Sequence, residues 1–238
     1  MEIKGLTQKK SIKTFTILVS ITIFYMIYRY QGSTGFFLFN LSKSNVFSEA
    51  QARSMYYQWT MAFLLLGVFP GLIVKIGFRE PLRLYGLCIP KPFQTFFITL
   101  VGILIATPIV YLGSKRAEFN SIYPLVQNAG DSPILFIRSS LFYFLYYIGY
   151  EFCFRGFLFM GIRDDIGDAQ ALGVSLAATV LLHVTQPQSE MIMAFVIGIA
   201  FPLIVRKLKS LWPAIMIHAY AGIALDYWCI INRGGFVV

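Results

Sequence analysis

Long apolar stretches separated by short polar segments restrict this chain to one broad class of fold. Hydrophobic residues make up 57% of its 238 positions, charged residues make up 13%, and the mean hydropathy is +0.68. A soluble domain carries roughly a quarter charged residues. A segment surrounded by lipid has to satisfy its own backbone hydrogen bonds, which a helix does. The composition therefore predicts an all-α polytopic membrane protein.

Seven stretches are long and apolar enough to predict membrane-spanning helices, since roughly 20 residues of helix cross the hydrocarbon core. The predicted spans are 15–30, 57–78, 93–113, 133–161, 169–184, 191–205 and 211–231. A half-helix at 35–41 would make eight. The fifth and sixth spans are short, so we expect them to be tilted or broken inside the bundle. The segments 42–56 and 114–132 are predicted to be loops.

Basic residues lie at the ends of these stretches, where they predict the orientation of the chain. The net charge of +9 would suggest nucleic-acid binding in a soluble protein, but this distribution predicts membrane lipids as partners and no nucleic acid. Alternating spans place about twice as many Lys and Arg residues on the N-terminal side as on the other. We therefore expect an integral multi-pass protein of the plasma (inner) membrane with a cytoplasmic N-terminus, in which the first span is an uncleaved signal anchor.

Two opposite charges lie inside one of the most apolar segments, YEFCFRGFLF. Glu151 and Arg155 are four residues apart, so on a helix they share a face and can form an ion pair. A charge at membrane depth costs about 2.5–3.5 kcal/mol even on mild insertion scales, so such residues usually face an internal cavity and have a function. The pair could alternatively lock its helix to neighbouring helices.

Both histidines of the chain lie near the ends of apolar stretches. Together with Glu151, His183 and His218 form a set spread over three helices, which can converge in a bundle. Glu190 follows His183 after the helix-breaking Pro187, and it is either a second acid at the site or a solvated residue at a helix start. Asp226 follows His218 by eight residues on nearly the same face. It could act in the chemistry, orient His218 or anchor its helix, while Gly222 between them is expected to leave room.

Three short segments resemble the signature helices of a known family. YEFCFRGFLF, HVTQP and SLWPAIMIHA are similar to the motifs of the CPBP family, the CAAX proteases and bacteriocin-processing intramembrane proteases also called ABI proteins. The resemblance divides the chain into N-terminal helices and loops at 1–132 and a protease core at 133–232, within one integrated membrane domain. The family usually carries two adjacent glutamates in the first motif and an asparagine four residues after the third-motif histidine. Tyr150 and Gly222 occupy those two places, which resembles a single-glutamate subgroup.

The resemblance implies an intramembrane endopeptidase acting on a membrane-associated or lipidated peptide or protein. Glu151 or Glu190 would activate water, His183 would orient the water, and His218 would support the oxyanion. Arg155 would keep Glu151 ionised. The reaction would need either no cofactor or a divalent metal, with zinc held by Glu151, His183 and His218. We expect Glu151, Arg155 and both histidines to meet around one cavity, although strict alternation puts His183 near the outer end of its helix.

Two other functions stay open. A catalytically inactive CPBP-like scaffold would explain why Tyr150 and Gly222 replace expected site residues. A transporter would also bury polar residues at mid-membrane, but it would often show internal repeats or paired broken helices, which the sequence does not display.

Overall fold

The computed structural model of the chain describes residues 2–184 and 186–236, and side chains from residue 11 onward. The side chains of Lys4, Lys9 and Lys10 in the predicted basic cluster, and Thr185 in the HVTQP motif, lie outside that description. Every regular element among the described residues is helical, which confirms the predicted all-α class.

The helices follow one another along the chain with few long connections. Their bounds are α1 (Glu2–Tyr30), α2 (Thr34–Asn40), α3 (Phe47–Ala62), η1 (Phe63–Val68), α4 (Phe69–Leu72), η2 (Ile73–Phe78), η3 (Leu82–Tyr85), α5 (Pro92–Ser114), α6 (Ala117–Asn120), η4 (Gln127–Asp131), α7 (Pro133–Glu151), η5 (Phe152–Met160), α8 (Gly161–Ile166), α9 (Asp168–Leu181), α10 (Gln188–Leu208) and α11 (Trp212–Asn232). The elements η1, η2 and η5 are π-helical, and η3 and η4 are 3₁₀ turns.

Five helices of the described chain are long and apolar enough to cross a membrane: Ser11–Tyr30, Phe47–Phe78, Pro92–Ser114, Gln188–Leu208 and Trp212–Asn232. They correspond to five of the seven predicted spans and indicate an integral multi-pass membrane protein. The exposed surface of α5 carries many large apolar side chains, among them Phe93, Phe96 and Leu104, as expected of a helix that faces lipid. The half-helix expected at 35–41 corresponds to α2.

The other two predicted spans differ from the five. The stretch 133–161 is part of a continuous helix from α7 through η5 to α8, but its tyrosines and charged residues make it less apolar than the rest. The stretch 169–184 forms only the 14-residue α9, about 21 Å long and too short to cross ~30 Å of hydrocarbon alone. The count of seven or eight spans therefore stays a prediction.

One predicted loop was wrong. Most of 42–56 is the first half of the long helix that begins at α3, and only 42–46 is irregular. The segment is polar enough to resemble a connection, but its Ala, Gln, Glu, Arg and Met residues favour helix. Small and aromatic side chains on one face, among them Ala52, Tyr56 and Trp59, are buried. The second predicted loop, 114–132, is irregular apart from the short α6 and η4.

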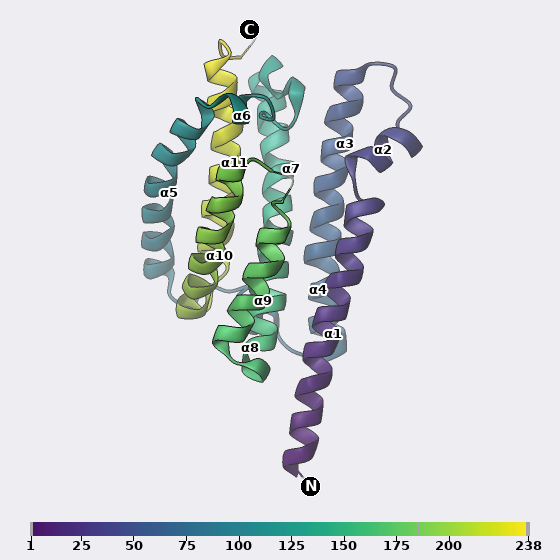
Figure 1. Cartoon of the computed structure of the whole chain (residues 1–238), viewed down its shortest axis with the longest axis vertical. Coiled ribbons are helices and arrows are strands. Elements are labelled where there is room, and N and C mark those ends of the chain that lie inside the picture. Colours follow the sequence, from purple (N-terminus) through teal and green to yellow (C-terminus); the bar gives the residue numbers. More distant parts are fainter. Residues whose placement is uncertain (1, 185, 237–238) are drawn as a thin grey trace.

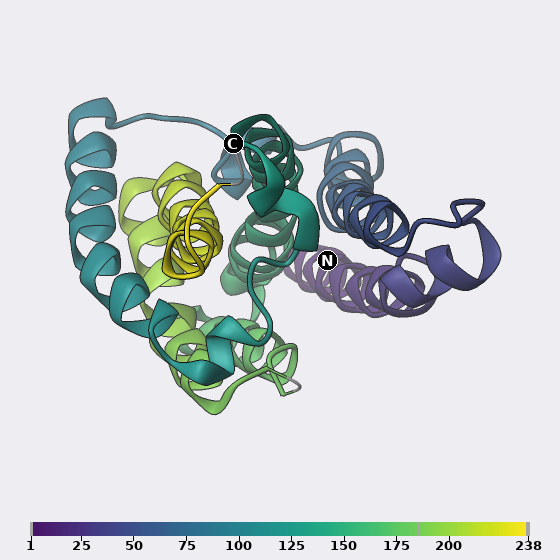
Figure 2. The same cartoon turned by 90° about the horizontal axis from the view of Figure 1, so that it is seen from above.

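The helix α7 lies at the centre of the bundle. Seen from above, it stands between the α1 and α3 pair on one side and α10, α11 and α5 on the other (Figure 2). The chain runs up and down the long axis, so the N-terminus and the C-terminus lie at opposite ends (Figure 1). The turn between α9 and α10 lies part-way along the bundle, while α5, α7 and α11 extend beyond it (Figure 1). Residues in this turn therefore lie part-way along the bundle rather than at one of its ends.

Glycines let α7 approach the α3 side closely. A Cβ at Gly149 would lie 2.9 Å from the carbonyl oxygen of Ala62 and from Cα of Phe63, and one at Gly67 would lie 3.1 Å from Cα of Gly149. In lipid there is no hydrophobic driving force between helices, so helices associate largely through van der Waals packing. Backbones that meet this closely gain such contacts. The side chains of η5 are almost all buried just below this crossing.

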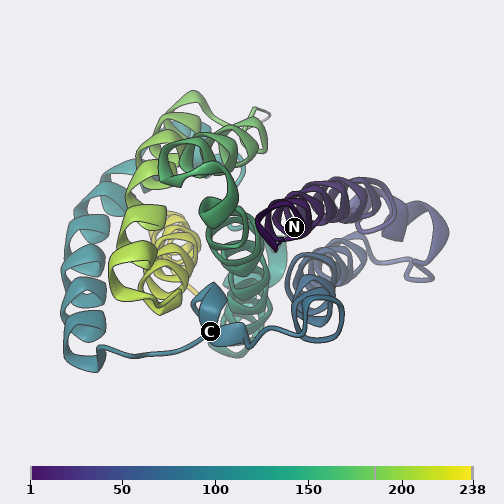
Figure 3. The same cartoon turned by 90° about the horizontal axis from the view of Figure 1, so that it is seen from below.

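Polar contacts fasten the end of the bundle at which the N-terminus lies. The ammonium group of Lys13 bonds both carboxylate oxygens of Glu80, at 3.0 and 2.8 Å, and the hydroxyl of Tyr85 donates to the same carboxylate at 2.5 Å. Asp168 pairs with Arg163 at 2.8 Å and with Arg206 at 2.5 Å. Figure 3 shows α8 and the segment between η2 and α5 gathered at this end. These contacts join α1 to the segment at η3, and α9 to α8 and α10.

The α7 crossing generates a stability prediction. Gly149→Ala places a methyl group against backbone atoms that have no freedom to rotate away, and we expect a loss of about 1–3 kcal/mol. Thermal unfolding of the detergent-solubilised protein measures the loss. Gly173→Ala in α9 is the matched control, because a Cβ there meets nothing within 4 Å. Equal melting temperatures for the two variants would contradict the close crossing.

The positions of the two chain ends also predict how the protein is oriented in the membrane. Because the two ends of the chain lie at opposite ends of the bundle, a reporter fused after Lys13 should report the cytoplasm and one fused after Val238 the other side. Cytoplasmic signals from both fusions would mean an even number of crossings.

Candidate active site

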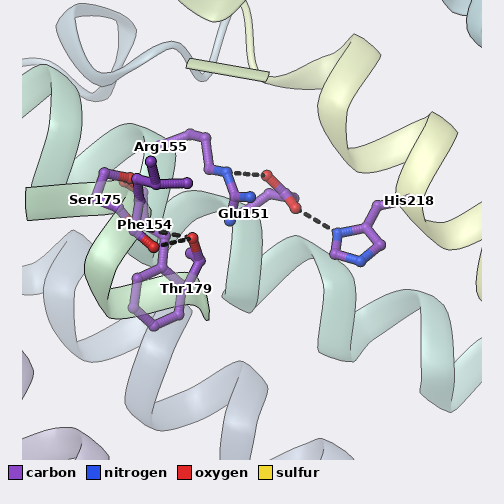
Figure 4. Close-up of polar contacts among 7 residues, drawn as sticks. Glu151, Phe154, Arg155, Ser175, Thr179 and His218 are labelled. Carbon is purple, nitrogen blue, oxygen red and sulfur yellow. Dashed lines mark hydrogen bonds and ion pairs between the residues drawn. The ribbon is translucent and has the colours of Figure 1, made fainter. Parts of the chain in front are cut away.

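The buried charge pair lies where α7 changes into the π-helix η5. Glu151 is fully buried, Arg155 is 1% exposed, and Nε of Arg155 lies 3.2 Å from Oε2 of Glu151. A π-helical segment within an α-helix is rare and often marks a functional site. The wider turn leaves the carbonyl of Phe154 to accept a hydrogen bond from the Ser175 hydroxyl of α9 at 3.0 Å (Figure 4). This bond ties α9 to the charge pair.

The second carboxylate oxygen of Glu151 holds a histidine. Oε1 of Glu151 lies 2.6 Å from Nδ1 of His218 on α11, so the carboxylate stands between the imidazole and Arg155 (Figure 4). An ionised carboxylate only accepts hydrogen bonds, so Nδ1 of His218 carries a proton. The other ring nitrogen, Nε2, is left for another partner.

The other histidine is oriented by the backbone of its own helix. His183 follows α9, and its Nδ1 lies 2.8 Å from the carbonyl oxygen of Thr179. A carbonyl oxygen only accepts, so this nitrogen also carries a proton and Nε2 is again free. The hydroxyl of Thr179 in turn donates to the carbonyl of Ser175, at 2.9 Å. A continuous set of contacts therefore runs from η5 along α9 to His183.

Glu190 lies in the first turn of α10, just after the turn that carries His183. Its Oε2 accepts a hydrogen bond from the Tyr123 hydroxyl at 3.2 Å. Tyr123 belongs to the segment between α6 and η4. The hydroxyl of Ser189, next to Glu190, donates to Glu118 of α6 at 2.7 Å. These contacts fasten the α9–α10 turn against the loop above it.

Two cavities meet at these residues. The first, of about 290 Å³, is bounded by α1, α3, α7 and the α9–α10 turn, and polar groups such as Tyr28, Gln58 and Tyr150 line it. The second, of about 560 Å³, lies between α5, α10 and α11 and is mostly apolar. The residues that line both cavities are Tyr123, Tyr143, Tyr147, His183, Glu190 and His218. We call this set the shared wall.

The family comparison matches this part of the chain. Residues 132–224 fit the profile of the family described as type II CAAX prenyl endopeptidase Rce1-like. That stretch is similar to an Rce1-like domain. It includes both histidines, Glu151, Arg155 and Glu190, while Asp226 lies just beyond its end. The family is a peptidase family. No curated protein and no solved structure matches the chain.

The predicted site residues of the Rce1-like domain separate into two positions. His183, Glu190 and His218 face the cavities. Glu151 and Arg155 line neither cavity and lie behind His218. Strict alternation puts His183 near the outer end of its helix, but α9 has only 14 residues and the turn after it lies part-way along the bundle.

Asp226 lines neither of the two cavities. It is 3% exposed, and its Oδ1 accepts a hydrogen bond from the backbone N–H of Leu125 at 3.0 Å. Among the three roles that the sequence left open, this contact favours anchoring: it fastens α11 to the segment between α6 and η4. Arg233 further along the chain bonds the carbonyl of Tyr123 in the same segment, at 2.6 Å.

Gly222 leaves room for side chains of α7, as the sequence led us to expect. A Cβ at Gly222 would collide with the hydroxyl of Tyr147 and would lie 2.9 Å from Cε1 of Tyr143. Two side chains from α7 therefore fill the space. The backbone of α11 runs directly under the Tyr147 hydroxyl.

The tyrosines of the shared wall are the part of the site that the sequence did not predict. Tyr143, Tyr146, Tyr147 and Tyr150 all lie on α7, and their rings contact one another at centroid distances of 4.7–5.9 Å. Tyrosine is common in membrane helices, so a single one carries little information. The usable signal was their recurrence three and four residues apart, which puts them on the same side of one helix as Glu151.

The donor set does not fit a metal site. Zinc needs three protein ligands at about 2.0–2.2 Å with an open position. Within the part of the chain that the structure describes, no three His, Cys, Asp or Glu side chains group closely enough to hold a metal ion. Both oxygens of Glu151 are already occupied by His218 and Arg155. No step of the reaction is therefore routed through a metal.

Several buried polar atoms at the site lack a complete hydrogen bond. They are the Tyr150 hydroxyl, Oε2 of Glu151, and Nε and Nη1 of Arg155. An unmet buried polar group costs about 1–3 kcal/mol, so such groups usually bind ordered water. Tyr150 also lines the polar cavity. The arrangement is suited to bringing water to the shared wall.

The charge pair generates a second stability prediction. Glu151→Ala leaves Arg155 buried without its partner, which should cost about 3–5 kcal/mol. The double variant Glu151→Leu/Arg155→Met removes both charges and should recover most of the loss. Thermal unfolding in detergent measures both variants. A double variant no more stable than Glu151→Ala would show that the single change acts by some route other than the unpaired arginine.

Proposed function

We propose that the protein is an intramembrane endopeptidase of the single-glutamate type that hydrolyses a peptide bond in a membrane-associated or lipidated peptide. One observation carries the proposal: an acid and two histidines converge on the wall where a polar and an apolar cavity meet. Hydrolysis within a membrane needs water and an apolar substrate at the same point. The Rce1-like domain supports the reaction class, because members of that family are peptidases.

The geometry favours Glu190 as the general base. A general base has to lie within hydrogen-bond reach of the water that it deprotonates. Glu190 lines both cavities and is bonded only through one oxygen, to Tyr123, so the carboxylate keeps acceptor capacity. Glu151 lines neither cavity and is held on both sides. The sequence favours Glu151 for this role because of its depth, and we propose instead that Glu151 positions His218.

The two histidines have different partners and therefore different roles. Nε2 of His183 is an acceptor, because Nδ1 carries the proton, and it can orient the attacking water. The carboxylate of Glu151 stabilises a protonated ring at His218, as the acid of a catalytic triad does for its histidine. In that form Nε2–H of His218 donates to the oxygen of the scissile carbonyl.

The hydrolytic step balances with these groups alone. Glu190 takes one proton from water as the oxygen of the water bonds to the carbonyl carbon, which leaves the carbonyl oxygen as an oxyanion. The carbon–nitrogen bond then breaks, and Glu190 returns the proton to the leaving amine. The products are a carboxylic acid, which then loses its proton to water, and an amine, and Glu190 is again ionised.

The two cavities would have different roles in the reaction. The apolar cavity lies between α5, α10 and α11 and can hold the hydrocarbon part of a lipidated or transmembrane peptide. The polar cavity can supply water from the side of α1 and α3. The scissile bond would then lie at the shared wall.

Carboxylate-to-amide substitutions test the choice of base. Glu190→Gln keeps the shape of the side chain but cannot take a proton from water, so we expect turnover to fall by about 10²–10⁴. The assay follows cleavage of a quenched fluorescent peptide that ends in a farnesylated CAAX sequence, with purified protein in lipid nanodiscs. Glu118→Gln is the matched control, because Glu118 lies beside the same turn and lines neither cavity.

The outcomes separate the alternatives. Full activity of Glu190→Gln together with inactive Glu151→Gln would return the role of base to Glu151. If wild type and all three variants cleave equally slowly, or not at all, the protein is not a peptidase for this class of substrate, and the inactive scaffold is favoured.

A further inference from the structure

The side chain of Tyr147 occupies the centre of the shared wall. It is 5% exposed and lines both cavities. Its ring lies 4.4 Å from the imidazole of His218, centroid to centroid, with a tilt of 43°. His218 in turn is held by Glu151 from behind. The phenol is therefore fixed beside the one imidazole that the reaction requires to face the scissile carbonyl.

Gly222 shows that the hydroxyl, and not the ring alone, shapes this position. A Cβ at Gly222 would collide with the Tyr147 hydroxyl oxygen. A phenylalanine would fill the core without this atom and would require less space on α11. The Tyr147 hydroxyl shares a hydrogen bond with the hydroxyl of Tyr143. When it accepts that bond, its own proton remains available for a polar partner in the cavity.

Three other tyrosines near this position have different surroundings. The hydroxyl of Tyr123 donates to Glu190. The ring of Tyr143 is stacked on Trp59 at 4.6 Å, with an interplanar angle of 11°, which holds it towards α3. Tyr150 lines only the polar cavity. Tyr147 is the one whose ring lies directly against His218 and whose hydroxyl reaches α11.

We propose that Tyr147 is a catalytic residue whose hydroxyl donates a hydrogen bond to the oxyanion of the scissile carbonyl. It would act beside Nε2–H of His218, so that two donors from α7 and α11 meet the same oxygen. This proposal rests on the proposed function and adds a residue to the same site. Removing one such donor typically lowers kcat by about 10²–10³.

The first test removes only the hydroxyl. Tyr147→Phe should lower kcat for the farnesylated fluorescent peptide by about 10²–10³ and leave KM unchanged, since the hydrogen bond strengthens in the transition state. Tyr146→Phe is the matched control: it removes a hydroxyl one residue away that lines only the polar cavity. Melting temperatures in detergent show whether each variant is folded.

The second test uses the collision at Gly222. Gly222→Ala pushes a methyl group against the hydroxyl, so it should lower kcat in the wild-type background. In the Tyr147→Phe background the same change should lower kcat less, because the nearest atom that it displaces is already absent and only the contact with the Tyr143 ring remains. Additive effects would show that Gly222 and the Tyr147 hydroxyl act independently.

The results distinguish this proposal from the function on which it rests. If wild type cleaves the peptide, Glu190→Gln is inactive and Tyr147→Phe has the kcat of wild type, the role of Tyr147 is overturned and the peptidase stands. If wild type does not cleave the peptide, both are overturned. A fall in kcat for Tyr147→Phe that Tyr146→Phe matches would also overturn the specific role of Tyr147.

Discussion

A single carboxylate, held between a guanidinium and an imidazole in a largely apolar bundle, organises this protein. Glu151 is fully buried, with Arg155 on one side and His218 on the other. Removing these groups from water is costly, and the cost is met only when each has its partner in place. The contact therefore fixes how α7 and η5 stand relative to α11. It also decides which nitrogen of His218 faces the cavities.

Small residues and hydrogen bonds to backbone carbonyls connect this contact to the rest of the site. Gly149 lets α7 meet the α3 side at backbone distance, and Gly222 lets α11 meet the Tyr147 hydroxyl. On the other side, the widened turn of η5 offers the carbonyl of Phe154 to Ser175, and the bonds continue along α9 to His183. The two histidines are thus oriented by separate means and still line the same cavities.

The sequence predicted the features that depend on apolar length and on charges in apolar surroundings. A buried ion pair is conspicuous in a chain with few charges, so Glu151 and Arg155 could be singled out, and the spacing of four predicted their contact. The position of His183 could not be derived, because it depends on α9 ending early and on the turn after it lying part-way along the bundle. The assumption that every predicted helix crosses the whole membrane cannot place such a turn correctly.

The sequence also did not predict the two cavities. Depth in the apolar sequence drew attention to Glu151, whereas access to the cavities distinguishes Glu190, and access is a property of the packed helices. The sequence suggested that Gly222 leaves room, but not that the Tyr147 side chain occupies that room. Tyr147 itself resembles the other tyrosines of α7 in sequence, and only its contacts with His218 and Gly222 set it apart.

The orientation of the two imidazoles can be measured directly, because the chain contains only two histidines. Nitrogen NMR of protein labelled with ¹⁵N-histidine, in lipid nanodiscs near neutral pH, reports which ring nitrogens carry protons. The account predicts a protonated Nδ1 on both rings, and Glu151→Gln should shift the signals of His218 while those of His183 stay unchanged. A ring protonated only on Nε2, or a Glu151→Gln spectrum identical to that of wild type, would contradict it.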